Sequence, residues 1–272
     1  MTTLERPAAV VTAELFEHAT PPPESLRPWI TEIGYIPTVF EPFEPFTHLP
    51  QAVTTIVLRT EPSGRRDALV VGPRTRATYS TAKQPAGCVR MRLAPGAARP
   101  LLGLPAADLT DRALPLGDVP GPAAELATAL TELDSEEVAA FLEQWLPQRL
   151  SEDPATRDHR RLLTAAVTAL TSSTAPVPAL AATLAVSERQ LRNLFTAGIG
   201  VSPKHFARID RVRRILAAAG DTGWAEVAAA TGYYDQSHMT ADFRSLMGVT
   251  PDRFRKGDLP APAACRALPR AA

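Results

Sequence analysis

The sequence lacks any long apolar run, and it contains few cysteine, histidine or aromatic residues. No stretch approaches the roughly 18 consecutive apolar residues that a membrane-spanning helix needs, so we expect no membrane association. The first residues include Glu5, Glu14 and Glu17, and no basic start is followed by an apolar segment. This pattern argues against an export signal and favours a cytoplasmic protein.

The shortage of metal-ligating and nucleophilic residues excludes several classes of site. Cys88 and Cys265 are the only cysteines, too few for a disulfide framework or a cysteine-based zinc site. His18 and His48 are the only histidines before residue 159, and neither has metal-ligand spacing. Nucleophile-elbow, phosphate-loop and dinucleotide-binding motifs are also absent. We therefore expect no metal, no cofactor and no enzymatic activity, against the alternative of a fused N-terminal enzyme.

The net charge of zero conceals a difference between the two halves of the chain. Residues 1–150 hold 13 Lys/Arg and 18 Asp/Glu, a net charge of −5, whereas residues 151–272 hold 16 and 11, a net charge of +5. A basic half is typical of a nucleic-acid-binding protein. A solvated cationic surface would give the same count, so charge alone does not decide the function.

The chain changes character near residue 120. Before that point, short runs that alternate or are rich in β-branched residues predict strands at Trp29–Ile36, Ala52–Leu58, Ala68–Val71 and Cys88–Leu93. After it, helical spacing dominates residues 123–133, 135–150 and 154–171, and a hinge follows at 172–176. The fold class is therefore α+β. We expect a β-rich domain over 1–120, a helical linker region over 121–175, an all-α domain over 176–257 and a disordered tail over 258–272.

An internal repeat with an offset of 48 residues is the most informative feature. Phe195 matches Phe243 and Phe206 matches Phe254, and Gly200-Val201-Ser202-Pro203 matches Gly248-Val249-Thr250-Pro251. Upstream the offset becomes 47, where Ala181 matches Ala228 and Ala185 matches Gly232. A one-residue difference in a turn explains this shift, so we interpret the repeat as a duplication.

Each copy has the pattern of a short helix, a tight turn and a second helix. In the first copy Pro178 suits a helix start, and Ser187 with Gln190 forms a capping-box signature for the next helix. In the second copy Asp235 suits the same capping position. This pattern is typical of helix-turn-helix units, which place their second helix in the DNA major groove. The chain therefore predicts two such units.

Polar side chains occupy the predicted outward faces of the two second helices. In the first helix they are Arg189, Gln190, Arg192, Asn193 and Thr196; in the second they are Gln236, Ser237, His238, Thr240 and Arg244. Arginine, glutamine and asparagine suit bidentate contact with base edges. The alternatives are a helical bundle with a merely solvated face and a module that binds only protein.

One helix of about 17 residues, 203–219, should join the two units and span about 25 Å. A strut of this length can hold two recognition helices near the roughly 34 Å that separates successive major-groove faces. Its cationic residues either contact phosphates or pair with acids such as Asp210. They are Lys204, Arg208, Arg211, Arg213 and Arg214.

The C-terminal third resembles the AraC/XylS family of bacterial transcription regulators over about residues 160–257. The matching residues are Gly232-Tyr233-Tyr234-Asp235-Gln236-Ser237-His238, Phe243, Gly248–Pro251 and Phe254-Arg255, with Ser187, Leu191, Phe195 and Gly200–Pro203 in the first copy. The resemblance implies sequence-specific binding to double-stranded DNA, with possible contact to RNA polymerase. It also implies base contacts from Arg189, Arg192 and Asn193, and from Gln236, Ser237, His238 and Thr240.

This chain departs from the family pattern at two positions. Ala241 stands where many relatives carry Arg, so we expect the first recognition helix to supply most of the specificity. Ala185 replaces the usual turn glycine of the first unit. His238 is either a base or phosphate contact or a histidine that packs at the helix cap.

The N-terminal half resembles, more weakly, the cupin-like effector-binding and dimerisation domains attached to this family. The matching residues are Val71-Gly72-Pro73, Ala94-Pro95-Gly96-Ala97 and Leu101-Leu102-Gly103. This resemblance implies a homodimer and an unidentified small-molecule effector. Arg74, Arg76, Arg90 and Arg92 either line an anion pocket or form a solvated sheet face.

Overall fold

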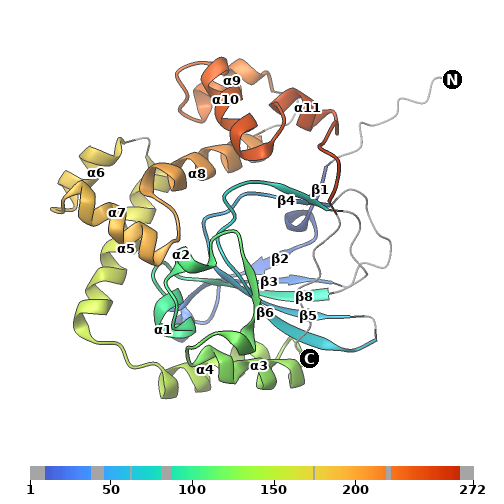
Figure 1. The fold of residues 1–272 in the computed structure, drawn as a ribbon, viewed down its shortest axis with the longest axis vertical. Coiled ribbons are helices and arrows are strands. Elements are labelled where there is room, and N and C mark those ends of the chain that lie inside the picture. Colours follow the sequence, from blue (N-terminus) through green and yellow to red (C-terminus); the bar gives the residue numbers. More distant parts are fainter. Residues whose placement is uncertain are drawn as a thin grey trace.

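The computed structural model describes residues 10–37, 46–61, 63–80, 87–173, 175–218 and 222–263 (Figure 1). Strands prevail up to residue 93, and helices prevail after residue 98 apart from one short strand at 113–115, which confirms the predicted α+β class. Short 3-10 helices occur at η1 (Ala13–Leu15), η2 (Glu24–Leu26) and η3 (Leu116–Asp118).

A six-stranded antiparallel sheet forms the centre of the N-terminal half, in the order β2-β3-β8-β5-β6-β9. Its strands are β2 (His18–Thr20), β3 (Ile30–Ile36), β5 (Thr55–Thr60), β6 (Arg66–Val71), β8 (Gly87–Leu93) and β9 (Ala113–Pro115). A smaller sheet, β1-β4-β7, contains β1 (Val11–Thr12), β4 (Phe46–His48) and β7 (Thr78–Ser80). All four predicted strands exist. However, β5 starts later than expected because Ala52 packs against the helical half of the molecule.

The strand β8 shows why this sequence forms a sheet with two unlike faces. Val89, Met91 and Leu93 alternate with Arg90 and Arg92 and are at most 3% exposed. Their face packs against short helices that the sequence patterns did not predict, α1 (Ala98–Leu102) and α2 (Ala106–Leu109). Helices α3 (Ala123–Glu132) and α4 (Val138–Arg149) cover the same core (Figure 1). The helical region expected as a linker thus contributes two helices to the N-terminal core.

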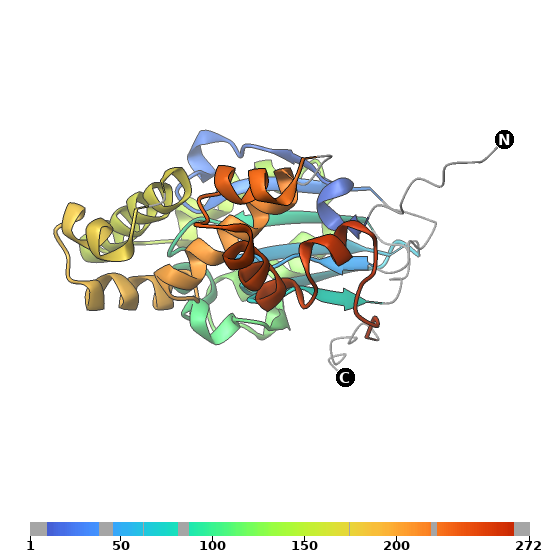
Figure 2. The same ribbon diagram turned by 90° about the horizontal axis from the view of Figure 1, so that it is seen from above.

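The remaining helices build the C-terminal half. They are α5 (Pro154–Ser172), α6 (Val177–Thr183), α7 (Glu188–Gly198), α8 (Pro203–Ala218), α9 (Trp224–Ala230), α10 (Gln236–Met247) and α11 (Pro251–Arg255). One apolar cluster joins α5, α6 and α7 to the start of α8. A second cluster joins the rest of α8 to α9 and α10. Viewed from above, these helices run from one end of the molecule across the sheet (Figure 2).

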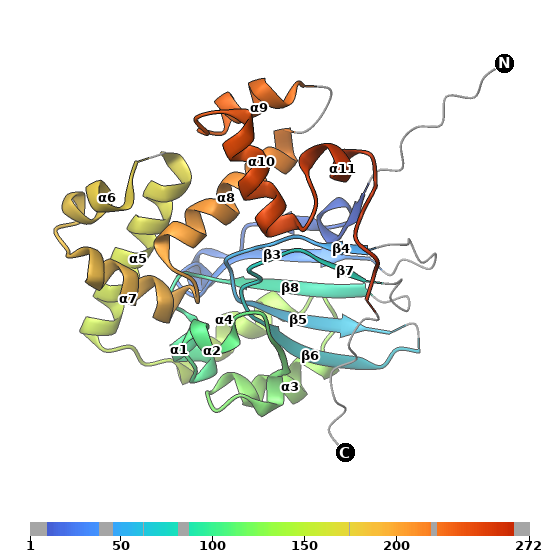
Figure 3. The same cartoon turned by 45° about the horizontal axis from the view of Figure 1, so that its top comes forward.

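The two halves are in contact along the length of α8. Leu49 of the N-terminal half belongs to the core cluster of α9 and α10. The view of Figure 3 places α10 and α11 above β4 and β7. After α11, the Ala263 amide donates to the Tyr79 carbonyl oxygen at 3.0 Å, and Ala263 forms a bridge with Ser80. Residues 258–263 therefore differ from the disordered tail expected there, and residues 264–272 lie outside the described residues.

Candidate nucleic-acid interface

The first unit consists of α6, a tight turn and α7. The Ser187 hydroxyl accepts a hydrogen bond from the Gln190 amide at 3.1 Å, as a helix N-cap does. Leu191 and Phe195 are fully buried, and the Phe195 ring lies edge-on to Phe206 of α8. The predicted cap and apolar stripe are therefore both present in the structure.

The second unit consists of α9, a turn and α10. The Asp235 carboxylate accepts a hydrogen bond from the His238 amide at 2.7 Å and caps α10. Met239 and Phe243 are buried, and the Phe243 ring lies edge-on to Phe254 of α11. Phe254 thus repeats the relationship that Phe206 has to the first unit.

The two turns use equivalent backbone hydrogen bonds. In the first turn the Val186 amide donates to Ala181 O at 3.0 Å, and in the second the Tyr233 amide donates to Ala228 O at 3.0 Å. The residue that changes the repeat offset from 47 to 48 is Tyr234, which follows this bond and is 93% exposed. The extra residue therefore lies at the surface directly before the cap of α10.

The predicted contact residues lie mainly on exposed surfaces of the two helices. Nine are exposed: Arg189, Gln190, Arg192, Asn193, Thr196, Gln236, Ser237, His238 and Arg244. Thr240 is half-buried at the edge of α10. The structure thus brings the predicted residues together as one group on α7 and another on α10.

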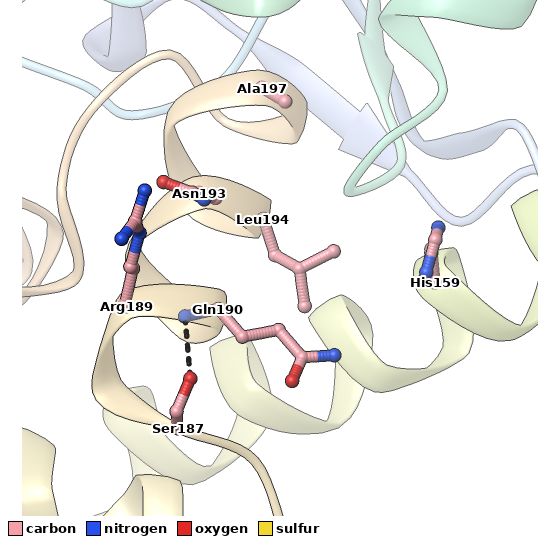
Figure 4. Close-up of a pocket in the computed structure, with 7 residues that line it drawn as sticks. All are labelled: His159, Ser187, Arg189, Gln190, Asn193, Leu194 and Ala197. Atoms are coloured by element: carbon pink, nitrogen blue, oxygen red, sulfur yellow. Dashed lines mark hydrogen bonds between the residues drawn. The ribbon is translucent and has the colours of Figure 1, made fainter.

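Side-chain direction divides the group on α7. Arg189 and Asn193, four residues apart on one helix face, point away from α5 (Figure 4). Gln190 and Leu194 point toward α5 and its residue His159. All four residues line a cavity of about 420 Å³, together with His159, Ser187 and Ala197. Arg189 and Asn193 therefore form the part of α7 best placed to enter a groove.

The outward face of α10 carries fewer long polar side chains than that of α7. The repeat pairs Arg189 with Ser237 and Asn193 with Ala241, and Ala241 is exposed. The His238 ring lies edge-on to the Tyr233 ring at a centroid distance of 5.2 Å, while His238 stays exposed. The His238 ring thus packs at the helix cap and is still accessible for a DNA contact, so the structure agrees with both interpretations of this residue.

The arginines of α8 are paired with carboxylates. Arg208 and Arg211 both contact Asp242 of α10, at 2.9 and 3.4 Å. Arg214 pairs with Asp210 at 3.0 Å. The remaining arginine, Arg213, pairs with Glu14 of the N-terminal half at 3.5 Å. The pairing hypothesis therefore agrees with the structure for the four arginines, whereas Lys204 is exposed and forms no ion pair among the described residues.

The recognition helices differ from the strut in this respect. Within the described part of the chain, no acidic side chain forms an ion pair with Arg189, Arg192 or Arg244. Their guanidinium groups are exposed donors, as contacts to bases or phosphates require. Both α7 and α10 thus carry positive charge that is available to DNA.

Asp242 is a functional candidate that the sequence patterns did not reveal. Its carboxylate forms ion pairs with two arginines of α8 and lies 3.4 Å from the Tyr233 hydroxyl. The side chain of Asp242 is only 13% exposed. In the repeat it stands where the first unit has Leu194. The sequence does contain a signal that could have identified Asp242, namely a carboxylate at a repeat position that is apolar in the other copy.

The arginines considered for an anion pocket have other surroundings. Arg90 and Arg92 both pair with Glu17, whose side chain is 4% exposed, so they do not form a solvated face. Arg92 also lines a cavity, together with Glu17, Glu32 and Arg213. Arg74 donates to the Leu49 carbonyl oxygen, and burial lowers its pKa to about 10. Arg76 forms no ion pair among the described residues.

Comparison with protein families places the C-terminal half. Residues 180–257 match the family described as "Helix-turn-helix domain", a match that spans both units. These residues are therefore a helix-turn-helix domain. Helix-turn-helix units place their second helix in the DNA major groove. Residues 18–115 match a family described as "Domain of unknown function (DUF6597)".

Several solved structures resemble parts of the chain that include the helix-turn-helix domain. The C-terminal domain of AraT, a response regulator from Geobacillus stearothermophilus, is 21% identical; the match covers 40% of this chain and 92% of that one, with a TM-score of 0.33. The DNA-binding domain of AdpA, solved in complex with a target DNA, is 23% identical over 39% and 93%, with a TM-score of 0.33. ToxT from Vibrio cholerae O395 is 10% identical over 84% and 97%, with a TM-score of 0.38. No curated protein matches the chain.

Two searches of the described residues bear on other kinds of site. In those residues no helix combines the length and apolar character needed to cross a bilayer. The same part of the chain holds no group of three or more His, Cys, Asp or Glu side chains arranged for a metal ion.

Proposed function

We propose that this protein is a transcription regulator of the AraC type that reads two successive major-groove segments, one with α7 and one with α10. The observation that carries this proposal is the distribution of free positive charge. Arg189, Arg192 and Arg244 are exposed without acidic partners among the described residues, whereas Arg208 and Arg211 of the strut both pair with Asp242. In a helical bundle with a merely solvated face, we would not expect unpaired arginines to lie on both of the equivalent helices.

The two recognition helices should contribute unequally. Arg189 and Asn193 give α7 two side chains with several donors on one outward face, whereas Ser237 and Ala241 occupy the equivalent positions of α10. Because bidentate contacts discriminate best between bases, the segment read by α7 should be the more strictly defined one.

Selection of bound sequences from random double-stranded DNA tests the proposal. The full-length protein should enrich a site with two parts about one helical turn apart, the part contacted by α7 showing the stronger base preference. Selection is run at about 150 mM salt or more, where non-specific binding is weak. Absence of any enriched sequence would exclude sequence-specific regulation and favour a module that binds only protein.

We also propose that a small molecule at the N-terminal half modulates DNA binding. A cavity of about 430 Å³ supports this proposal, because it is lined by Glu32 and Arg92 of the sheet and by Arg213 of α8. A polar ligand there would touch both halves of the chain. A screen of polar metabolites by thermal shift should find a stabilising compound, and this stabilisation should be lost in Glu32→Gln.

The same half is our proposed dimerisation region. Leu15 and Tyr35 are large apolar side chains that are 63% and 46% exposed there. Sedimentation equilibrium should give a dimer that dissociates when both residues are replaced by Ser. A monomer at about 10 μM would contradict this part of the proposal.

A further inference from the structure

The N-terminal half donates hydrogen bonds to equivalent points of the two helix-turn-helix units. The Gly96 amide donates to Gly198 O, at the end of α7, at 3.1 Å. The Ala77 amide donates to Leu246 O, near the end of α10, at 2.8 Å. Gly198 and Leu246 are separated by 48 residues, the offset of the internal repeat. The same carbonyl of each repeat is therefore held by a backbone amide of the N-terminal half.

A side-chain hydroxyl reinforces each of these contacts. The Thr110 hydroxyl donates to Gly200 O at 2.9 Å, and the Tyr79 hydroxyl donates to Met247 O at 2.6 Å. Carbonyls at helix C-termini have no partner within their own helix, so a donor from elsewhere satisfies them. Tyr79 is 8% exposed, and burial raises its pKa to about 12, so its hydroxyl remains a donor at neutral pH.

The two points of contact are connected through Asp111. Asp111 follows Thr110, and its carboxylate accepts hydrogen bonds from both the amide and the hydroxyl of Thr75, at 2.7 and 2.6 Å. Thr75 lies two residues before Ala77, the donor to the second unit. Asp111 itself has a left-handed backbone conformation, with φ of 57°, which an aspartate tolerates better than most residues. A short path of hydrogen bonds and covalent chain thus runs from Gly200 to Leu246 through the N-terminal half.

We propose that Thr110, Asp111 and Tyr79 are positioning residues that hold the two recognition helices at one separation. This inference rests on the proposed function, because the separation matters only if both helices read DNA. Without these bonds the separation would depend on α8 and on apolar packing, including that of Leu49 and Ala52 against the two units. With them, the N-terminal half determines which spacing of the two DNA segments the protein accepts.

The first test measures the separation directly, without DNA. Spin labels are attached through Thr196→Cys and Arg244→Cys, equivalent exposed positions of α7 and α10, in full-length protein carrying Cys88→Ser and Cys265→Ser. Labelled protein is diluted with an excess of unlabelled protein, so that distances within one chain dominate even in a dimer. We then expect one narrow distance distribution, which Asp111→Gly broadens about twofold, because glycine tolerates the backbone conformation but provides no acceptor. Asp111→Asn, which keeps an acceptor, should retain the narrow distribution.

More conservative variants test the same inference in case Asp111→Gly does not fold. Tyr79→Phe and Thr110→Val each remove one donor and keep the packed side chain, and each should broaden the distribution less than Asp111→Gly does. Thr131→Val is the matched control for Thr110→Val, since Thr131 lies on α3 and its hydroxyl donates to Thr128 O of the same helix. Unchanged widths in Asp111→Gly and Tyr79→Phe would overturn the inference, whatever the protein does with DNA.

The second test uses the selected DNA site with one or two base pairs inserted between its parts, each adding about 3.4 Å. Wild-type affinity should fall about tenfold for one inserted pair, and that of Asp111→Gly about threefold or less. A merely structural role would weaken binding by the same factor at every spacing, and that result would also overturn the inference. Failure of wild-type protein to select any DNA would instead contradict the proposed function.

Discussion

The carboxylate of Asp242 accepts a hydrogen bond from Nε of Arg208 at 2.9 Å and thereby joins the second recognition helix to the strut. The same carboxylate lies 3.4 Å from Arg211. Two arginines of α8 thus share one carboxylate of α10. This arrangement orients α10 and also removes positive charge that could otherwise bind phosphates without regard to sequence.

Replacing this carboxylate should make DNA binding stronger and less selective. In Asp242→Asn, Arg208 and Arg211 lose their ionic partner and become available to phosphates. The slope of log affinity against log salt should steepen by about 1 to 2, because each phosphate neutralised contributes about 0.9. Binding to random-sequence DNA, measured between about 50 and 200 mM salt, checks this.

The control for that measurement is Asp134→Asn. It makes the same change in net charge, but Asp134 is an exposed partner of Arg66 in the N-terminal half. If both variants shift the slope equally, long-range charge and not release of the strut arginines is responsible.

Arg189→Ala should reduce discrimination more than Ser237→Ala, its counterpart at the equivalent repeat position. A bidentate arginine contact is worth about 1–3 kcal/mol against the wrong base, and a single hydroxyl offers less geometric selectivity. Arg192→Ala should likewise cost more than Gln236→Ala. The measurement compares affinity for the selected site with affinity for single-base variants of it. Greater loss in Ser237→Ala would reverse the ranking of the two helices.

Ala185→Gly should stabilise the protein. Ala185 has a φ of 53° at the turn of the first unit, where its counterpart Gly232 has a φ of 77°. The left-handed conformation costs a non-glycine residue roughly 1–2 kcal/mol, of which the greater unfolded-state freedom of glycine cancels about half. We expect a gain of about 0.5–1 kcal/mol in the free energy of unfolding, measured by urea titration.

The reverse substitution, Gly232→Ala, provides the matched comparison. It should lower stability by a similar amount, because it creates at the second turn the strain already present at the first. Equal and small effects of both substitutions would show that neither turn stores appreciable strain.

Acidification should weaken the protein through His205 of α8. Burial, followed by the charge of Arg208, lowers the pKa of His205; Arg76 lowers it further, whereas Asp111 and a hydrogen bond with the Thr75 backbone act in the opposite direction. The unfolded chain therefore binds the proton more tightly than the folded one. Stability is fully present above the unfolded pKa of about 6.5 and is lost as pH falls below it.

The measurement compares urea midpoints at about pH 7.5 and about pH 5.5. His205→Gln should show a smaller decrease between these two values than wild type does. His159→Gln, which changes an exposed histidine of α5, should behave like wild type. The same decrease in all three proteins would assign the pH dependence to other groups.

Local chemistry made much of the C-terminal half predictable from the sequence. The caps Ser187 and Asp235, the buried spacing of Phe195 and Phe243, and the duplicated Gly-Val-Ser/Thr-Pro motif depend on neighbours within a few residues. Helix boundaries, turns and outward faces follow from such short-range preferences. The exposed positions of Arg189 and Asn193 could therefore be predicted without coordinates.

Only the tertiary structure decided which charges remain free and what holds the two units together. Asp242 and Arg208 are 34 positions apart in the sequence, and Tyr79 and Met247 are 168 apart. No periodic sequence pattern predicts contacts between residues so distant in the chain. The short helices α1 and α2 were missed for a similar reason, since their stability comes from burial against the sheet. The sequence by itself determined two helix-turn-helix units with polar outward faces, because those features are local. Their charge partners and their attachment to the N-terminal half depend on contacts that exist only once the chain has folded.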